Sequence, residues 1–354
     1  MKTQSRCVCN YQGEEGHASQ EGDGVRGAAS GEDGDSEEDG DDEEQRELRR
    51  RAIKLEGGQT TIFCWVPKEH IEEAIASRSK MKKKKKELKK VEKPALLLLH
   101  GFGSNGTDAW VGHVDALCKQ FALFIPDQLF FGESTTRSPT GRSETFQAEC
   151  IHSALLQLGV TLAFVAGHSY GGFVAYRLAH LFPAFVSKLV IIASGLLMDC
   201  HSNDAVIEKT GASSIHDILA PSSLPALRRT LTLVFNRPPA FPDFVLRALL
   251  KNPNRDQHVE LINAIELGQD EVPSELPKVT QKTLILWGEK DQIFDVKLAY
   301  ALEKYLEGNA QLKIFNGVGH VPQVAPGFNE EIISFLVEEH TQSASSSNVE
   351  ECLK

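Results

Sequence analysis

The stretch Gly167-His168-Ser169-Tyr170-Gly171-Gly172 follows the apolar run Leu162–Ala166 and precedes a segment with helical spacing. It has the G-x-S-x-G pattern in the strand–turn–helix context that the pattern requires. So sharp a turn strains the backbone of the serine, and the residues two positions away must be small, as Gly167 and Gly171 are. Although an ordinary glycine-rich turn has the same composition, this context predicts that Ser169 is a nucleophile at the end of a buried strand.

Strand-like and helix-like segments alternate on both sides of this stretch. Short apolar runs predict buried strands at Ala95–Leu99, Phe121–Pro126, Leu162–Ala166, Lys188–Ala193, Thr283–Trp287 and Gln311–Phe315. Helical spacing lies between them, at Thr107–Lys119, Glu144–Gln157, Gly172–Leu181, Val296–Leu306 and Asn329–Glu338. The sequence therefore predicts an α/β fold, with a mostly parallel sheet that helices cover on both faces.

A serine hydroxyl needs a base to take its proton and an acid to orient that base. Asp291 follows the strand-like run Thr283–Trp287, and His320 follows the next one within Gly-Val-Gly-His. Both are expected at the sheet edge where ligands gather, so we predict Asp291 as the acid and His320 as the base. Three other carboxylates are weighed against Asp291: Asp127 in a turn, Asp199 after an earlier strand, and Asp295 at the start of a helix.

The motif His100-Gly101-Phe102-Gly103 follows the first strand of the alternating region. A negatively charged tetrahedral intermediate needs preorganised hydrogen-bond donors. We expect the backbone N–H groups of Phe102 and Tyr170 to supply them, although a tight strand-to-helix connection would explain the same motif.

The alternation is lost between Gly195 and Leu276, where helical pieces and prolines occur without a strand-like run. We expect this segment to be a helical lid within a domain of residues 55–340. Seven of its apolar side chains are candidates for an acyl pocket, or for packing on the sheet. They are Leu231, Leu233, Val234, Phe235, Phe241, Phe244 and Val245.

Both ends of the chain differ in composition from this domain. Residues 1–54 form an acidic, Gly-rich tail and residues 341–354 a Ser-rich one. We expect both to be disordered, because they have few apolar side chains to bury. A lysine-rich excursion at residues 67–93 follows the strand-like run Gln59–Val66. Its run Lys82–Lys86 is compatible with a nuclear localisation signal, with a weak peripheral contact with an anionic membrane, or with a solvated loop.

Charge and composition exclude several classes of protein. The 354 residues have a net charge of −11, and residues 1–50 hold 15 acidic and 6 basic side chains, so the rest is nearly neutral. A nucleic-acid footprint is therefore not expected, nor is a membrane span, since no apolar run is long enough. Seven scattered cysteines without an apolar leader predict reduced thiols and a cytoplasmic protein. No metal-binding motif, cofactor motif or obligate protein partner is evident.

Taken together, these motifs resemble those of α/β-hydrolase-fold proteins, and most closely the plant serine hydrolases described as monoacylglycerol-lipase-like. The resemblance extends from Gln59 to Glu338 and includes P-D-Q-L-F-F-G-E-S at Pro126–Ser134 and L-W-G-E-K-D-Q-I-F at Leu286–Phe294. It implies Ser169, Asp291 and His320 as nucleophile, acid and base. It also implies that the Gly195–Leu276 insertion is the lid. Gln128 departs from the pattern, since such proteins often have Leu there.

A serine at this turn implies acyl transfer, because dehalogenases and epoxide hydrolases of this fold attack with an aspartate. We therefore expect a carboxylic-ester hydrolase that acts on a small or lipid-like acyl ester. Two alternatives share the same three residues: a small-molecule receptor and a carbon–carbon bond hydrolase.

Overall fold

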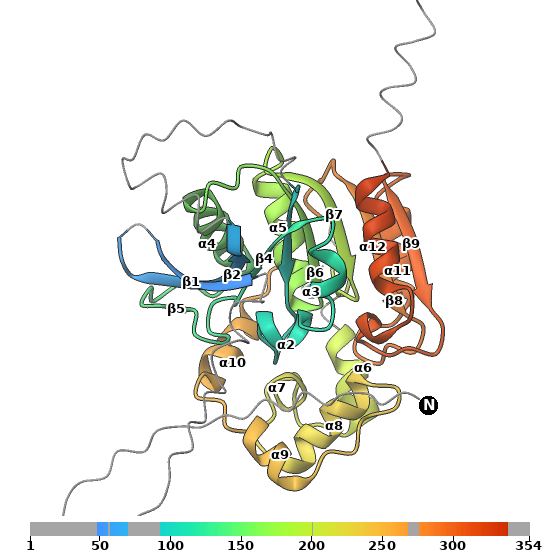
Figure 1. The fold of residues 1–354 in the computed structure, drawn as a ribbon. Coiled ribbons are helices and arrows are strands. Elements are labelled where there is room, and N and C mark those ends of the chain that lie inside the picture. The colour runs from blue at the N-terminus through green and yellow to red at the C-terminus, as the bar shows by residue number, and fades with distance from the viewer. Residues whose placement is uncertain (1–47, 56, 70–92, 200, 268–275, 339–354) are drawn as a thin grey trace, which may run out of the picture. The chain divides into compact units, whose positions relative to one another are not determined.

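The computed structural model describes residues 48–55, 57–69, 93–199, 201–267 and 276–338, all within the compact unit Arg46–Lys354. A mixed sheet lies at the centre of this unit (Figure 1). Its described strands are β1 (Leu48–Lys54), β2 (Thr60–Pro67), β3 (Ala95–Leu99), β4 (Ala122–Pro126), β5 (Thr135–Thr136), β6 (Ala163–His168), β7 (Val186–Ile192), β8 (Lys282–Gly288) and β9 (Ala310–Phe315). The order is β1-β2-β4-β3-β6-β7-β8-β9, with β5 beside β2. From β4 to β9 neighbouring strands are parallel, so the predicted fold class is confirmed.

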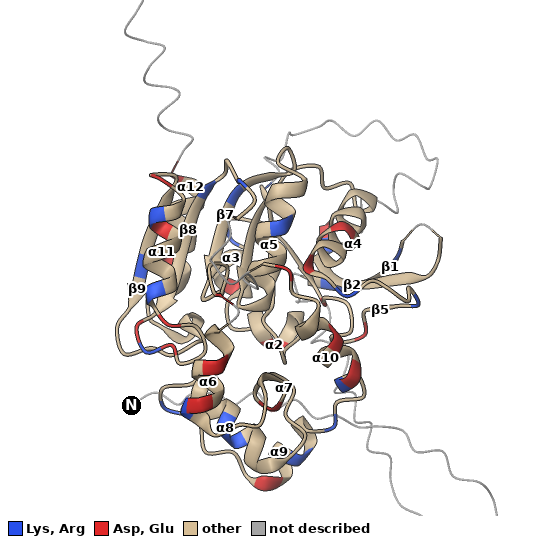
Figure 2. Cartoon of the chain, turned by 180° about the vertical axis from the view of Figure 1, so that it is seen from behind, with Lys and Arg blue, Asp and Glu red and all other residues tan. Residues whose placement is uncertain are grey.

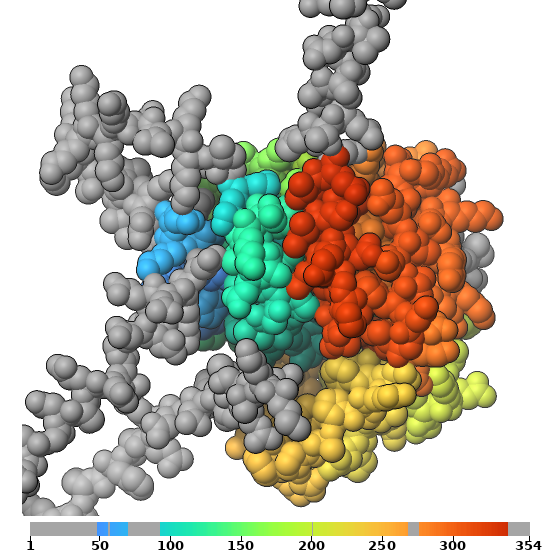
Figure 3. All heavy atoms as spheres, turned by 45° about the vertical axis from the view of Figure 1, so that its right-hand side comes forward, coloured from blue at the N-terminus to red at the C-terminus, as the bar shows by residue number. Residues whose placement is uncertain are grey.

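Strand β3 shows why both faces of the sheet are covered. Its residues Leu96 and Leu98 belong to one core cluster and Leu97 and Leu99 to the other, because successive side chains of a strand point to opposite faces. Helices α4 (Glu144–Gln157), α5 (Tyr170–Leu181) and α11 (Lys297–Tyr305) contribute to one cluster. Helices α3 (Val114–Leu117) and α12 (Phe328–Val337) contribute to the other and lie side by side (Figure 3). Charged side chains lie mainly on the outer helices and edge strands, and β3, β4 and β6 contain none (Figure 2).

The helix expected at Thr107–Lys119 is two short helices, α2 (Gly106–Trp110) and α3. Gly112 lies in the turn between them, where the cost of ordering a glycine in a helix favours the break. Trp110 of α2 and Leu117 of α3 are both fully buried.

The structure corrects the boundary of the N-terminal tail. Residues up to 54 were expected to be disordered, yet Leu48–Lys54 forms β1 and pairs antiparallel with β2 along its whole length. Leu48 and Ile53 are buried against the sheet, and the charged side chains between them stay at least partly in solvent. The rest of the predicted tail, the run Lys82–Lys86 and the predicted tail 341–354 lie outside the described residues.

The segment that was expected to be a helical lid contains helices and no strand in the parts described, residues 195–199, 201–267 and 276. Its helices are α6 (Ser202–Thr210), α7 (Ile215–Leu219), α8 (Leu224–Val234), α9 (Asp243–Leu249) and α10 (Arg255–Asn263). They gather at the lower end of the sheet in Figure 1, where the parallel strands end. We call these residues the insertion. Among the described helices, none is long and apolar enough to cross a membrane.

Candidate active site

Ser169 occupies a sharp turn between β6 and α5. Its backbone angles are φ 52° and ψ −116°, in a region that side-chain-bearing residues rarely adopt. Two backbone hydrogen bonds hold this geometry: Ser169 N donates to the carbonyl of Ile192, and Gly172 N donates to the carbonyl of Ser169. The strain is thus supported by the neighbouring strand and the first turn of the helix.

Gly171 allows the turn to lie against the strand beside it. A Cβ atom at this position would lie 2.6 Å from the carbonyl oxygen of His100 and 2.7 Å from that of Leu99. Both are backbone atoms and cannot move aside as a flexible side chain can. The glycine is therefore required by the close approach of β3 and the turn after β6.

Ser169, His320 and Asp291 form one hydrogen-bonded row. The Oγ atom of Ser169 lies 2.9 Å from Nε2 of His320, and Nδ1 of His320 lies 2.8 Å from Oδ2 of Asp291. All three residues are buried. Because an ionised carboxylate only accepts, Asp291 places the ring proton on Nδ1 and leaves Nε2 free to accept the serine proton.

The carboxylate of Asp291 is itself fixed by the loop that follows β8. Its Oδ1 atom accepts hydrogen bonds from the N–H groups of Ile293 and Phe294, at 2.9 and 3.0 Å. The second oxygen is thereby aimed at His320. The loop after β8 therefore sets the orientation of the His320 ring through Asp291.

The backbone of His320 is held on both sides by contacts that the sequence did not indicate. Its N–H donates to the carbonyl of Val234 at the end of α8, and its carbonyl accepts from Nε2 of His168 at 2.9 Å. Burial, and secondarily His320, lowers the pKa of His168 to about 3, so this ring stays neutral. The ring of His168 therefore contacts the backbone of His320 itself.

The insertion also contacts the loops that carry the row. Asn236 donates to the carbonyl of Gly317, and Gln292 donates to the carbonyl of Thr232. A Cβ atom on Gly319 would lie 2.8 Å from the carbonyl oxygen of Val234. The end of α8 therefore packs directly on the backbone beside His320.

The loop after β3 lies against the same turn. A Cβ atom on Gly101 would lie 3.2 Å from Cβ of Ser169, and the rings of Phe102 and Tyr170 meet edge to face at 5.5 Å. The structure thus brings together the two residues whose N–H groups were expected to bind an oxyanion.

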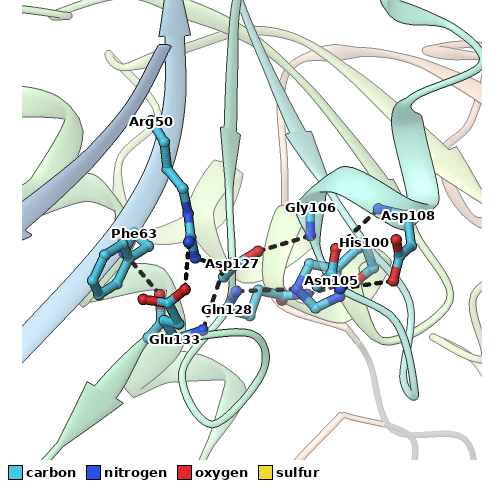
Figure 4. A network of polar contacts seen from close by, with 10 residues as sticks. Arg50, Phe63, His100, Asn105, Gly106, Asp108, Asp127, Gln128 and Glu133 are labelled. Carbon is cyan, nitrogen blue, oxygen red and sulfur yellow. Dashed lines mark hydrogen bonds and ion pairs between the residues drawn. The ribbon is translucent and has the colours of Figure 1, made fainter. Parts of the chain in front are cut away.

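A polar network holds the start of this loop (Figure 4). Gln128 N donates to Nε2 of His100 at 3.0 Å, and the side chain of Gln128 donates to the carbonyl of His100 at 2.6 Å. Asp127 accepts from Gly106 N and pairs with Arg50. Burial lowers the pKa of His100, which keeps the ring neutral and able to accept from Gln128. Asp127 is thus a structural residue, and Gln128 connects two loops.

The other carboxylates that were weighed against Asp291 serve local structure. Asp199 accepts from His201 N and the hydroxyl of Ser202 near the start of α6. Asp295 accepts from Lys297 N at the start of α11. Neither is hydrogen-bonded to His320 in the described structure. No group of three or more His, Cys, Asp or Glu side chains within the described ranges could hold a metal ion.

The apolar side chains of the insertion have different surroundings. Leu233 is buried in a small cluster with Ala212 and Ile218, both from the insertion. Phe244 is 74% exposed, so it lies on the surface rather than in an acyl pocket. At least these two of the seven side chains therefore differ in their surroundings.

Comparison with known proteins identifies the family of the chain. Residues 94–214 match the family model described as alpha/beta hydrolase fold. The monoacylglycerol lipase abhd6-B of Xenopus laevis is 30% identical over 240 residues, which cover 64% of this chain and 70% of that protein. The chain belongs to the α/β-hydrolase family.

Two further proteins are similar to this α/β hydrolase. The pimeloyl-acyl-carrier-protein methyl ester esterase of Vibrio vulnificus (strain CMCP6) is 28% identical over 247 residues, covering 68% of this chain and 94% of the esterase. The structure of the meta-cleavage product hydrolase from Pseudomonas fluorescens IP01 superposes with a TM-score of 0.62 at 18% identity, covering 82% of this chain and 98% of that one. At that identity the likeness shows a shared fold.

Proposed function

We propose that this α/β hydrolase cleaves a carboxylic ester through an acyl-enzyme formed on Ser169. The observation that carries the proposal is the 2.9 Å contact between Ser169 Oγ and Nε2 of His320, whose other ring nitrogen is held by Asp291. The relatives named as a monoacylglycerol lipase and a methyl ester esterase support an ester substrate.

Acylation starts when His320 Nε2 takes the hydroxyl proton of Ser169 as Oγ attacks the ester carbonyl carbon. Asp291 stabilises the positively charged imidazole ring that results. The N–H groups of Phe102 and Tyr170 donate to the oxygen that becomes negatively charged, and one such donor contributes about 3 kcal/mol. The tetrahedral intermediate collapses when His320 gives its proton to the leaving alcohol oxygen, and the acyl group stays on Ser169.

Deacylation repeats these steps with water. His320 takes a proton from a water molecule, whose oxygen attacks the acyl carbon. The second tetrahedral intermediate then releases the carboxylic acid, and the proton returns to Oγ of Ser169. The two steps together consume one ester and one water molecule, release an alcohol and a carboxylic acid, and return Ser169 and His320 to their starting states.

The test compares wild-type protein and Ser169→Ala on p-nitrophenyl esters of increasing acyl-chain length. We expect the variant to lose at least about 10⁴-fold in kcat, because the nucleophile and its base act as a unit. A fluorophosphonate probe should label the wild-type chain at Ser169 and leave the variant unlabelled. Ser202→Ala, which changes a hydroxyl near the start of α6, is the control and should retain activity.

Equal rates for the wild type and Ser169→Ala would contradict the proposal. A ligand-stabilised protein without turnover would favour the receptor alternative. Turnover of a vinylogous diketone, with none of any ester, would favour the carbon–carbon bond hydrolase. The chain-length series distinguishes a small ester from a lipid-like one.

A further inference from the structure

His258 on helix α10 places its imidazole ring against Phe102 of the loop after β3 and Phe131 of the segment after β4. It is 5% exposed, although it comes from the insertion. Its ring stacks on Phe131, with 4.3 Å between centroids and 26° between planes, and meets Phe102 edge-on at 5.2 Å. The insertion therefore contacts the loop after β3 through a fully packed ring.

Both ring nitrogens of His258 have hydrogen-bond partners. Nε2 donates to the carbonyl of Phe130 at 2.8 Å, and Nδ1 accepts from the amide of Asn252 at 2.9 Å. This fixes the neutral tautomer with its proton on Nε2, and burial lowers the pKa of the ring below its ordinary value. With both nitrogens engaged, His258 has no free site for proton transfer, so any role in the reaction is indirect.

The carbonyl that His258 binds belongs to a strained residue. Phe130 has φ 71°, which is unfavourable for a residue with a side chain, and its carbonyl also accepts from Asn254 at 3.0 Å. Two residues at the start of α10 thus hold the backbone that presents Phe131. This geometry depends on the insertion being in place.

Phe102 is enclosed by the rings that this backbone presents. Its ring meets Phe131 at 5.1 Å, Tyr170 at 5.5 Å and His258 at 5.2 Å, with interplanar angles of 88°, 87° and 71°. Edge-to-face contacts of this kind each add about 1 kcal/mol and restrict the ring orientation. The N–H of Phe102 is one of the two proposed oxyanion donors, and contacts that hold its ring also restrict the backbone of the loop that carries this N–H.

We propose that His258 is a positioning residue, which holds the N–H donor of Phe102 in place for the oxyanion. The inference rests on the proposed ester hydrolysis and adds to it a role for the insertion. In this role α10 assembles part of the catalytic geometry and does more than cover the substrate. Removing the ring contact or the hydrogen bond should weaken transition-state binding and leave substrate binding nearly unchanged.

Two substitutions separate the contributions of His258. His258→Gln keeps a donor for the carbonyl of Phe130 but loses the ring, and His258→Phe keeps the ring but loses the donor. Each should lower kcat about 10-fold to 100-fold with KM within about two-fold, because a small misplacement of a catalytic group has effects of that size. The affinity for a trifluoromethyl ketone, which forms a tetrahedral adduct, should fall by the same factor as kcat/KM.

His113 provides the matched control. It is a half-buried histidine that, like His258, packs against aromatic rings, here those of Trp110 and Phe328, and has a side-chain hydrogen bond to Asn329. His113→Gln and His113→Phe should lower the melting temperature comparably and leave kcat and the ketone affinity unchanged. Asn252→Ala is a milder change, because it leaves the His258 ring and its bond to Phe130 in place. It removes the partner of Nδ1 and the acceptor of Asn254 N, and should give a smaller loss of kcat in a folded protein.

Folded His258 and Asn252 variants with wild-type kcat and ketone affinity would overturn the inference. If Ser169→Ala abolished turnover in the same series, the proposed function would still stand. Equal losses of kcat in the His113 variants would also overturn it, because the effect would then follow from stability alone. Turnover that does not depend on Ser169 would overturn the proposed function, and the inference with it.

Discussion

Asp291 and Asp199 both follow strands of the parallel sheet, and their surroundings separate their roles. Asp291 is buried and divides its oxygens between backbone N–H groups and the ring of His320. Asp199 accepts from residues of its own turn. A carboxylate can orient and stabilise an imidazolium only when it contacts the ring, so the two residues should respond differently to the same change.

Asp291→Asn should lower kcat about 10³-fold to 10⁴-fold while the protein stays folded. The amide retains the shape of the side chain, but its NH₂ group opposes Nδ1–H of His320 and favours the wrong tautomer. Steady-state kinetics on a p-nitrophenyl ester measure the effect. Asp199→Asn is the control and should stay within about two-fold of wild type; an equal loss in both variants would contradict the assignment of Asp291.

The central row could be predicted from the sequence because each member follows a strand at the same sheet edge. Ser169 lies in a glycine-flanked turn, and Asp291 and His320 come directly after apolar runs. The contacts of His168 and His258 could not be predicted in this way. Each joins residues more than a hundred positions apart, and an isolated histidine gives no periodicity that would point to its partner.

At the scale of elements, Glu144 connects the insertion to the sheet. This fully buried residue opens α4, accepts from the N–H groups of Glu266 and Leu267, and pairs with Arg177 on α5. Residues 266 and 267 lie just after α10. The carboxylate therefore ties the segment after α10 to helices α4 and α5.

Glu144→Gln should lower the free energy of unfolding by about 3 kcal/mol, measured by urea denaturation. An amide cannot accept from all of these donors, and Arg177 loses a buried countercharge. Glu260→Gln is the matched control: Glu260 pairs with Arg142 at the surface, so its loss should change stability by less than about 1 kcal/mol. Similar changes in the two variants would show that the buried contacts of Glu144 contribute no more to the free energy of unfolding than a surface ion pair does.

The alternation of apolar runs and helical spacing predicted the parallel strands closely, because those strands are buried on both faces. Strand β1 was missed, since three consecutive arginines in Leu48–Lys54 favour solvent and the strand forms through pairing with β2. The break between α2 and α3 was missed because helical spacing continues across Gly112. Both differences arise where tertiary contacts override the local pattern.

Across the whole described unit, several histidines are held neutral by burial. Desolvation lowers the pKa values of His100, His113, His168 and His258 below 6.5. In the unfolded chain these groups bind protons near pH 6.5, whereas in the folded state they do so only at lower pH. The stability that they provide is therefore present above about pH 6.5 and is lost as the pH falls below it.

The urea concentration at the midpoint of unfolding should thus decrease when the pH is lowered from about 7.5 to about 5.5. The histidines are the groups that change stability in this pH range. Carboxylates with a lowered pKa, such as Asp217 and Glu289, change the stability only below about pH 4.5. His113→Gln removes one of these histidines and should make the dependence on pH shallower. A flat profile across this window would contradict the expectation.

Strand β1 also bears on how this protein can be shortened. It forms one border of the sheet, and its arginines discourage a second sheet from pairing there, as charged border strands commonly do. Starting the chain at residue 57 would uncover the N–H and C=O groups of β2 and remove Arg50 from Asp127. Static light scattering should show self-association growing with time for that version, while a chain starting at residue 46 scatters like the full-length protein. The trimming site for crystallisation or assay is therefore set by the start of β1, several residues before the change in composition.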